Sequence, residues 1–533
     1  MPSEPSIQDI LESVPATFRG PGGAVAVVKD GELAGQHVWG FANLDARILL
    51  TPATIFPICS ISKQMVCLVL RDLLQNDKDK AFENALTKAL HDLLPQDIMA
   101  NQDLTLERLV AMQSGIRDYW ALTVLWGATP GGKFSIYEDA PQALKRVGGF
   151  HFPPGTSMSY ANTNFMALGL AIERASGQTL GDLLQERLFK RAAMTTAALR
   201  PDTERLPPPI VGYEGSDGTG YIAYKNRIEW AGDAGITASL EDMVAYEKYI
   251  DRSATDPDSA YHKNTQQPHY LDGSPAFYGY GLIHSEIEGM KVVGHGGAIA
   301  GFRLIRFYVA EKRISIIVLL NSDANTEEVG KHILRKIVGK RTEHEALEEV
   351  NVDWTGPYFD QQNSLAITVS QPKPGELVIN YSGHDAKLKV TIPTQASSSS
   401  MKVTHEDGRL IIQRLRGYRS TARPLQSPTK SEDTTPLLYT GSYRSEEIDS
   451  TFHVAGAGGM LYGYFDGYLG QGPVHLMRHV AEDVWSLACH RSLDAPAPGD
   501  WTVLFHRDGD CKTVKGVTVG CPLAMNILFD KMQ

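Results

Sequence analysis

The stretch from residue 55 to residue 72 constrains this chain most, because it places a serine and a lysine at the start of an apolar helix. It reads Ile-Phe-Pro-Ile-Cys-Ser-Ile-Ser-Lys-Gln-Met-Val-Cys-Leu-Val-Leu-Arg-Asp, a pattern typical of an extended segment, a turn and a buried helix. Ser60 and Lys63 are three residues apart, so their side chains can meet on one helix face. A serine hydroxyl needs a base to become nucleophilic, and a lysine with a lowered pKa can be that base.

The Ser-x-x-Lys spacing is weak evidence alone, because a chain of this length contains it about once or twice by chance. A second copy, Ser427-Pro-Thr-Lys430, has no apolar run behind it, and we expect it to lie in a linker rich in Ser, Thr and Pro. Cys59 is an alternative nucleophile, although a buried cysteine more often acts as a small apolar residue. Other parts of the chain must therefore decide whether Ser60 is catalytic.

Composition narrows the classes of partner. The chain has 533 residues, with 51 Lys and Arg against 62 Asp and Glu and a formal net charge of −11, which opposes binding to nucleic acid or to an anionic membrane surface. The first residues lack the basic start of a signal peptide, and no stretch approaches the roughly 18 apolar residues of a membrane span. Five scattered cysteines form no C-x-x-C pair, so neither a disulfide framework nor a zinc site is indicated. We expect a cytoplasmic protein without a metal or other cofactor.

Apolar patterning predicts an α/β (α+β) first domain over residues 1–342. Two apolar runs around Asp30-Gly31 predict a β-hairpin. Residues 80–200 indicate mainly helices, one of which is expected to end at Gly115 as a C-cap. Strand-like runs return between residues 291 and 321. Strands at both ends with helices between them predict one antiparallel sheet with a helical insert.

The rest of the chain indicates an internal duplication. Trp354-Thr-Gly-Pro-Tyr358 and Tyr439-Thr-Gly-Ser-Tyr443 share an aromatic-Thr-Gly-x-Tyr phrase, and strand-like sequence follows each. We expect two antiparallel β-barrels, over residues 346–424 and 437–533, joined by a linker rich in Ser, Thr and Pro.

Two further motifs carry groups that suit acyl transfer. Tyr160-Ala-Asn162 precedes a helical run, and His295-Gly-Gly-Ala298 lies in a strand whose glycines allow close approach to the backbone. Each is weak alone: the first recurs as Tyr224-Lys-Asn226, and a lone histidine is more often structural than catalytic.

In this order, Ser60-Ile-Ser-Lys63, Tyr160-Ala-Asn162 and His295-Gly-Gly297 resemble the serine β-lactamase and penicillin-recognising superfamily over about residues 20–340. The phrases at residues 112–119 and 152–156 are similar too. Histidine replaces the lysine that many β-lactamases carry in the third element, as in the esterase and aminopeptidase branches. Two following barrels, expected to be eight-stranded, resemble the bacterial D-stereospecific aminopeptidase branch across the whole chain.

That resemblance implies a homodimer that releases an N-terminal D-residue, with D-alanine favoured, from small peptides, amides or esters, and that β-lactams can inhibit. Ser60 would form an acyl-enzyme, with Lys63 or Tyr160 as the base. The backbone N–H groups of Ser60 and Ala298 would bind the oxyanion. Asn162 would orient the substrate or Lys63.

The resemblance also implies a hydrogen bond from His295 to Tyr160 or to the substrate. It places a loop at about residues 490–500 in the mouth of the site, with Asp494 as the candidate contact to the substrate. An aminopeptidase needs an acidic group and a steric stop for a free ammonium. The same loop sequence is also typical of an ordinary exposed turn.

Two alternatives stay open from the sequence. One is a penicillin-recognising esterase, D,D-carboxypeptidase or β-lactamase, although the lack of an export signal argues against a cell-wall role. The other is a non-catalytic binding protein with the same fold, against which the intact set of Ser60, Lys63, Tyr160 and His295 argues.

Overall fold

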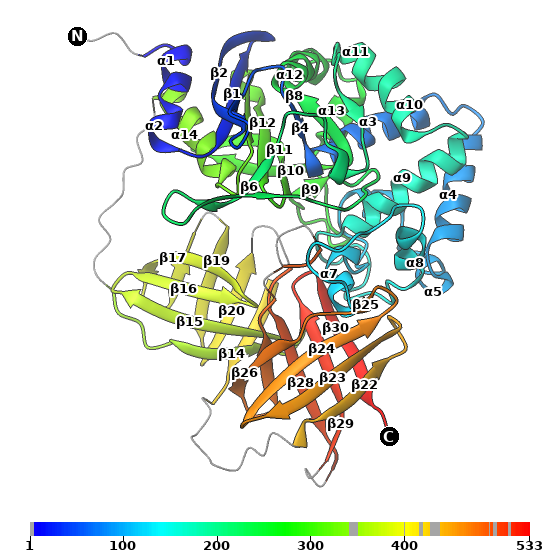
Figure 1. The fold of residues 1–533 in the computed structure, drawn as a ribbon, viewed down its shortest axis with the longest axis vertical. Helices are drawn as coiled ribbons and strands as arrows, with labels where there is room; N and C mark the ends of the chain where they lie inside the picture. Colours follow the sequence, from blue (N-terminus) through cyan, green and yellow to red (C-terminus); the bar gives the residue numbers. More distant parts are fainter. Residues whose placement is uncertain are drawn as a thin grey trace.

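The computed structural model describes residues 5–339, 350–398, 400–414, 419–426, 438–489, 491–493, 498–509 and 513–533. An α/β region formed by residues 5–339 sits above two β-barrels, which lie side by side beneath it (Figure 1). Within the described residues, no helix combines the length and apolar character that crossing a membrane requires.

One antiparallel sheet joins the two ends of the α/β region, as predicted. Its eight described strands run in the order β3-β2-β1-β13-β12-β11-β10-β9. The chain turns between β1 and β2 at Asp30 and Gly31, which both have positive φ. The strands are β1 (Gly22–Lys29), β2 (Glu32–Asn43), β3 (Ile48–Leu49), β9 (Tyr278–Gly279), β10 (Leu282–Ile287), β11 (Met290–Ile299), β12 (Phe302–Val309) and β13 (Ile314–Leu320).

Helices cover both faces of this sheet because its central strands are apolar on both sides. On one face, α1 (Ile7–Glu12), α2 (Val14–Thr17) and α14 (Thr326–Val338) pack on Val25, Val27 and Val318. On the other face lie α3 (Ser62–Gln75), α12 (Leu240–Ala254) and α13 (Ala260–Asn264). The helical insert adds α4 (Ala81–Leu93), α5 (Gln96–Met99), α6 (Leu106–Val110), α7 (Tyr119–Leu125), α8 (Asp139–Lys145), α9 (Asn162–Ser176), α10 (Leu180–Leu184) and α11 (Lys190–Ala192).

The prediction that a helix ends at Gly115 is wrong. The helix α6 stops at Val110, and Met112 takes a φ of 56°, so the chain turns before Gly115 is reached. Gly115 has a φ of 72°, and a Cβ there would lie 2.1 Å from the carbonyl oxygen of Phe152. The glycine is therefore required by a close chain crossing and does not cap a helix.

The first barrel, here barrel 1, closes from eight strands in the described part of the chain, as predicted. These are β14 (Gly356–Asp360), β15 (Leu365–Lys373), β16 (Glu376–Tyr381), β17 (His384–Ile392), β18 (Gln395–Ser397), β19 (Met401–Glu406), β20 (Arg409–Arg414) and β21 (Arg419–Pro424).

The second barrel, here barrel 2, is also closed, because β23 pairs with both β22 and β24. A short strand, β25, adds a hairpin at its edge. The strands are β22 (Gly441–Ser445), β23 (Ser450–Ala457), β24 (Met460–Gly467), β25 (Gly470–Gln471), β26 (His475–Ala481), β27 (Val484–Leu487), β28 (Trp501–Arg507), β29 (Val514–Cys521) and β30 (Ala524–Lys531).

The repeated aromatic-Thr-Gly-x-Tyr phrase makes the same contact in both barrels. The Tyr358 hydroxyl donates to the Trp354 carbonyl at 3.1 Å, and the Tyr443 hydroxyl donates to the Tyr439 carbonyl at 2.7 Å. In each barrel the tyrosine ties the entering chain to the first strand, β14 or β22. This equivalence supports the predicted duplication.

Barrel 2 packs tightly on the helical insert, and one hydrophobic core is continuous between them. The Trp126 indole N–H donates to the Ile448 carbonyl at 2.7 Å, and Arg117 forms an ion pair with Glu447 at 2.6 Å. Barrel 2 is therefore fixed against the segment that carries α7.

Candidate active site

Ser60 lies at the junction between an extended segment and the helix α3. The strand β4 (Ile55–Pro57) pairs with β8 (Ile236–Ser239), and Ser60 follows in a single 3-10 turn, η1 (Cys59–Ile61). Cys59 has a φ of 49°, a strained conformation for a residue with a side chain. A Cβ on Gly297 would lie 2.4 Å from the Ile58 carbonyl oxygen, so only glycine allows β11 to run this close to Ser60.

Lys63 is fully buried and points at Ser60. Its Nζ lies 3.0 Å from Ser60 Oγ, 2.8 Å from Asn162 Oδ1 and 2.6 Å from the Asp233 carbonyl oxygen. Burial lowers the pKa of Lys63 to about 8, against the opposing charges of Asp233 and Asp118. A substantial fraction of Lys63 is therefore neutral, and able to accept a proton, near physiological pH.

Tyr160 faces Ser60 from the segment just before α9. It is half-buried, and its ring lies 5.0 Å from Lys63 Nζ. Burial raises the pKa of Tyr160 well above its ordinary value, although a hydrogen bond with Ser60 works in the opposite direction. Tyr160 is therefore protonated at neutral pH and can donate a hydrogen bond.

Two buried carboxylates support Lys63 and Asn162. Asp118 caps α7 and accepts hydrogen bonds from the Asn162 backbone at 2.9 Å and from Asn162 Nδ2 at 3.2 Å. Burial raises the pKa of Asp118 to about 7. Asp233 accepts from the Tyr119 hydroxyl at 2.9 Å and from the Ala231 N–H at 2.9 Å, while its main-chain carbonyl meets Lys63.

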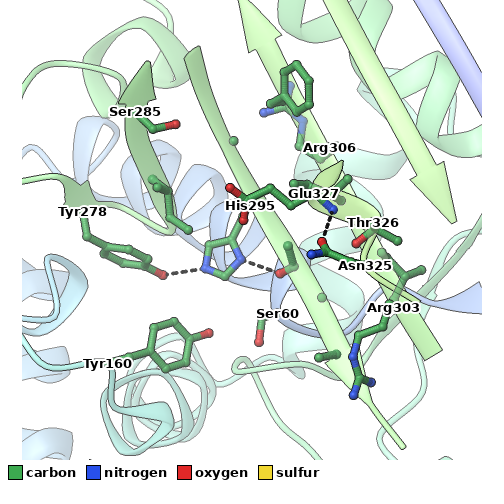
Figure 2. A pocket seen from close by; sticks show the side chains of 18 of the residues that line it. Ser60, Tyr160, Tyr278, Ser285, His295, Arg303, Arg306, Asn325, Thr326 and Glu327 are labelled. Atoms are coloured by element: carbon green, nitrogen blue, oxygen red, sulfur yellow. Dashed lines mark hydrogen bonds between the residues drawn. The ribbon is translucent and has the colours of Figure 1, made fainter. Parts of the chain in front are cut away.

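His295 projects from β11 toward the same space, beside Tyr278 and Tyr160 (Figure 2). Its Nδ1 lies 2.5 Å from the Gly296 carbonyl oxygen, and its Nε2 lies 3.1 Å from the Tyr278 hydroxyl. A carbonyl can only accept, so Nδ1 carries the proton and, in the neutral ring, Nε2 accepts from Tyr278. The ring centroids of Tyr160 and His295 lie 6.0 Å apart.

These side chains open into one cavity of about 760 Å³. Ser60, Tyr160, Asn162, His295 and Ala298 all line it. Its apolar wall includes Trp120, Met158, Phe277 and Leu523, and both barrels contribute to the lining, through Ser400 of barrel 1 and Pro498 and Leu523 of barrel 2. In the described residues, the site therefore combines a polar cluster with an apolar wall.

Comparison with known proteins shows which family the chain belongs to. A β-lactamase family model matches residues 7–340, and a model described as D-aminopeptidase, domain B, matches residues 347–530. A D-aminopeptidase from Brucella melitensis is 37% identical, covering 99% of each chain, and one from Brucella anthropi is 36% identical, covering 99% of this chain and 98% of the relative. The chain belongs to the D-aminopeptidase family.

Solved structures agree with the β-lactamase-like fold of this D-aminopeptidase family member. The octameric penicillin-binding protein homologue from Pyrococcus abyssi superposes with a TM-score of 0.52 at 20% identity, covering 78% of this chain and 99% of that one. The D-amino acid amidase from Ochrobactrum anthropi SV3, complexed with D-phenylalanine, has a TM-score of 0.50 at 19% identity, covering 63% and 98%. At these identities the likeness shows the fold alone.

The structure brings most of the predicted site residues together. Ser60, Lys63, Tyr160, Asn162, His295 and Ala298 converge in this D-aminopeptidase fold, whereas Asp494 lies outside the described residues. The second Ser-x-x-Lys copy, Ser427 to Lys430, also lies outside them.

The competing motifs have structural roles. Cys59 is fully buried, and burial raises its pKa to about 12, which makes a thiolate nucleophile unfavourable. Tyr224 packs under the guanidinium of Arg491, and Asn226 donates to the Ala300 carbonyl at 3.0 Å.

Sequence reasoning missed Asp118, Asp233, Tyr278 and Leu523. Asp118 had a usable signal, because an aspartate directly before the apolar run Tyr119-Trp-Ala-Leu122 is a typical N-cap. Asp233 contacts Lys63 through its main-chain carbonyl oxygen. Because every residue type has this group, the identity of residue 233 could not predict the contact. Tyr278 is an aromatic residue of a strand and Leu523 is an apolar residue of a turn, so no sequence pattern singled them out.

Proposed function

We propose that this chain is a serine aminopeptidase that releases an N-terminal D-residue, with D-alanine favoured, through an acyl-enzyme on Ser60. The observation that carries the proposal is the 3.0 Å contact between Lys63 Nζ and Ser60 Oγ within the polar cluster that lines the cavity. Preference for a D-residue is supported by full-length relatives named D-aminopeptidases. Preference for D-alanine rests on the sequence resemblance.

Lys63 is the better candidate for the base that takes the Ser60 proton. Its pKa is lowered to about 8 by burial, whereas burial raises the pKa of Tyr160 above its ordinary value. Neutral Lys63 accepts the serine proton as Oγ attacks the substrate carbonyl. Tyr160 then donates its hydroxyl proton to the leaving amine as the C–N bond breaks, and the Lys63 ammonium returns a proton to Tyr160. Water completes the cycle by hydrolysing the ester.

The tetrahedral oxyanion would be bound by the backbone N–H groups of Ser60 and Ala298. Support comes from the path of β11, which packs against η1 so that Gly297 lies directly over Ile58 and Cys59. Ala298 follows at once and lines the cavity together with Ser60. Asn162 would hold Lys63 in place through its Oδ1 atom.

The loop at residues 490–500 would close the mouth of the site and select a free ammonium, with Asp494 as its acidic contact. Both described ends of the loop are anchored. Ser492 Oγ donates to the Trp120 carbonyl at 2.8 Å, and the Leu493 carbonyl accepts from the Gly131 N–H at 3.2 Å. At the other end Pro498 lines the cavity, and its carbonyl lies 3.2 Å from His384 Nε2.

Mass spectrometry of the acylated protein tests the nucleophile. We expect a D-alanine ester to add the mass of one D-alanyl group to the wild type, and peptide mapping to place it on Ser60. Ser60→Ala should lose the adduct and the hydrolysis of D-alanine p-nitroanilide, while Ser427→Ala, in the other Ser-x-x-Lys copy, keeps both. Full turnover by Ser60→Ala would refute the assignment.

A substrate panel separates the proposal from its rivals. D-Alanine p-nitroanilide should be turned over far faster than the L-isomer, an N-acetylated D-alanine analogue or nitrocefin. Faster turnover of nitrocefin or of the blocked substrate would instead favour a β-lactamase, esterase or carboxypeptidase. Removing residues 494–497 should raise activity on the blocked substrate if the loop is the gate.

The remaining expectations from the resemblance are a homodimer and inhibition by β-lactams. Light scattering of the purified protein tests the first. Competition between a β-lactam and D-alanine p-nitroanilide tests the second.

A further inference from the structure

The tip of one hairpin in barrel 2 reaches the active site. Strands β29 and β30 pair as far as Cys521 and Ala524, which leaves Pro522 and Leu523 as a two-residue turn. In Figure 1 the strands of barrel 2 end against the region of α7. This turn lies about 460 residues from Ser60 in the sequence, yet Leu523 lines the same cavity.

Main-chain hydrogen bonds fix the turn against two segments that carry site residues. The Leu523 carbonyl accepts from the Asp118 N–H at 3.0 Å, and the Pro522 carbonyl accepts from Ser159 Oγ at 3.5 Å. Asp118 in turn binds Asn162, and Ser159 directly precedes Tyr160. The turn therefore braces both sides of the polar cluster.

Flanking contacts leave the backbone of the turn little freedom. Arg117 Nε donates to the Met525 carbonyl at 3.1 Å. Cys521, Ala524 and Met525 are fully buried, and Met525 packs against the hydrophobic core of barrel 1. Because the backbone is held on both sides, the shape of the cavity at this point depends on the volume of the Leu523 side chain.

The Leu523 side chain is half-buried and packs against the hydrophobic core. It belongs to the cavity wall that also includes Trp120 and Met158. In the proposed substrate, the carbon next to the attacked carbonyl carries an ammonium, a hydrogen and a side chain. Of these, only an apolar side chain is stabilised by burial against an apolar wall. A rigid apolar wall at the catalytic cluster is suited to select that side chain by size.

We propose that Leu523 is a specificity-determining residue that limits the size of the D-side chain accepted next to Ser60. The inference rests on the proposed aminopeptidase function and adds the residue that would set the size limit for the D-aminoacyl group. Barrel 2 would then contribute to substrate selection through a fixed hairpin turn, separately from the loop at residues 490–500.

The test compares D-alanine p-nitroanilide with D-phenylalanine p-nitroanilide in full-length protein. The measured quantity is the ratio of the two kcat/KM values, because a partial loss of folded enzyme cancels in it. Leu523→Ala should shift the ratio toward D-phenylalanine by about tenfold or more, and Leu523→Phe should shift it toward D-alanine. Leu523→Met, of similar volume, and Leu528→Ala, an exposed leucine on β30, serve as controls and should change the ratio less than about twofold.

The outcomes separate the two proposals. An unchanged ratio in Leu523→Ala and Leu523→Phe, with an active wild type, would overturn the role of Leu523, even if both activities fell together. A wild type that turns over neither substrate would refute the proposed function itself, and the inference with it. If Leu523→Phe fails to fold, the shift in Leu523→Ala decides the question alone.

Discussion

Two hydrogen bonds join Asp118 to Asn162, one to the backbone N–H at 2.9 Å and one to Nδ2 at 3.2 Å. Together they turn the Asn162 amide so that its Oδ1 faces Lys63 Nζ at 2.8 Å. In the proposed mechanism, Asp118 would therefore act through Asn162, as a positioning residue for Lys63.

Replacing Asp118 with Asn should lower kcat while leaving the fold intact. The new amide presents N–H groups where Asn162 also presents donors, and an unmatched buried donor costs about 1–3 kcal/mol. We expect kcat to fall about tenfold to a hundredfold, with little change in KM, measured with D-alanine p-nitroanilide. Circular dichroism checks the fold. Unchanged kcat would show that Asn162 is held by other contacts.

The pH dependence of kcat/KM should report Lys63. Its pKa is lowered to about 8, and only the neutral amine accepts a proton, so activity should rise about tenfold per pH unit below pH 7 and level off above pH 8. Lys63→Arg should lose at least about a hundredfold in kcat/KM, because a guanidinium stays protonated. A flat profile between pH 6 and pH 9 would rule out Lys63 as the base.

Tyr278→Phe should weaken catalysis through His295. The variant removes the hydroxyl 3.1 Å from His295 Nε2 and leaves the buried ring in place. The loss of one such bond is worth about 0.5–1.5 kcal/mol, or about a twofold to tenfold lower kcat/KM. A kcat/KM equal to that of the wild type would assign Tyr278 a packing role only.

How much of the site the sequence predicts depends on how each residue acts. The residues found from the sequence would act through their side chains, and they belong to short motifs of fixed spacing next to a helix or strand. These residues are Ser60, Lys63, Tyr160, Asn162 and His295. Asp233 meets Lys63 through a carbonyl oxygen that every residue type has. Leu523 depends on how barrel 2 docks, which no local pattern encodes.

The fold shows the same limit. The hairpin at Asp30-Gly31 could be predicted because both residues favour the turn conformation that the structure shows. The duplicated barrels could be predicted from the repeated aromatic-Thr-Gly-x-Tyr motif, whose last tyrosine makes the same local hydrogen bond in each barrel. The helix predicted to end at Gly115 follows its apolar pattern only to Val110. Beyond it, the chain turns at Met112, whose carbonyl accepts from the Ser159 N–H at 3.1 Å. A tertiary contact there overrides the local preference.

The ion pair between Arg117 and Glu447 should stabilise the docking of barrel 2. The Arg117 side chain is 3% exposed and that of Glu447 is 35% exposed, so removing the glutamate leaves a buried guanidinium partly unpaired. Glu447→Ala should lower the free energy of unfolding by about 1–3 kcal/mol, measured by urea denaturation. Glu482→Ala is the control in the same barrel, since the Glu482 side chain is 81% exposed in its ion pair with Arg507. This variant should lower the free energy of unfolding by less than about 1 kcal/mol. Equal effects of the two variants would contradict the prediction.

His151 should make the protein sensitive to acid. The residue is 8% exposed, and within the described residues neither ring nitrogen has a hydrogen-bond partner. Burial lowers the pKa of His151 from 6.5 to about 3, so the unfolded chain binds a proton that the folded chain rejects. Stability is therefore lost as pH falls from about 6.5 toward 3, by about 2 kcal/mol at pH 5.

A variant without the titrating ring isolates this effect. His151→Phe keeps an aromatic ring against Phe152 and removes the protonation, so its stability relative to the wild type should improve by about 2 kcal/mol between pH 7 and pH 5. Replacing the exposed His91 with Gln provides the control, for which we expect no such change. Urea denaturation of the wild type and the two variants at both pH values gives the six free energies of unfolding. Parallel stability curves for His151→Phe and the wild type would mean that protonation of another group governs the acid transition.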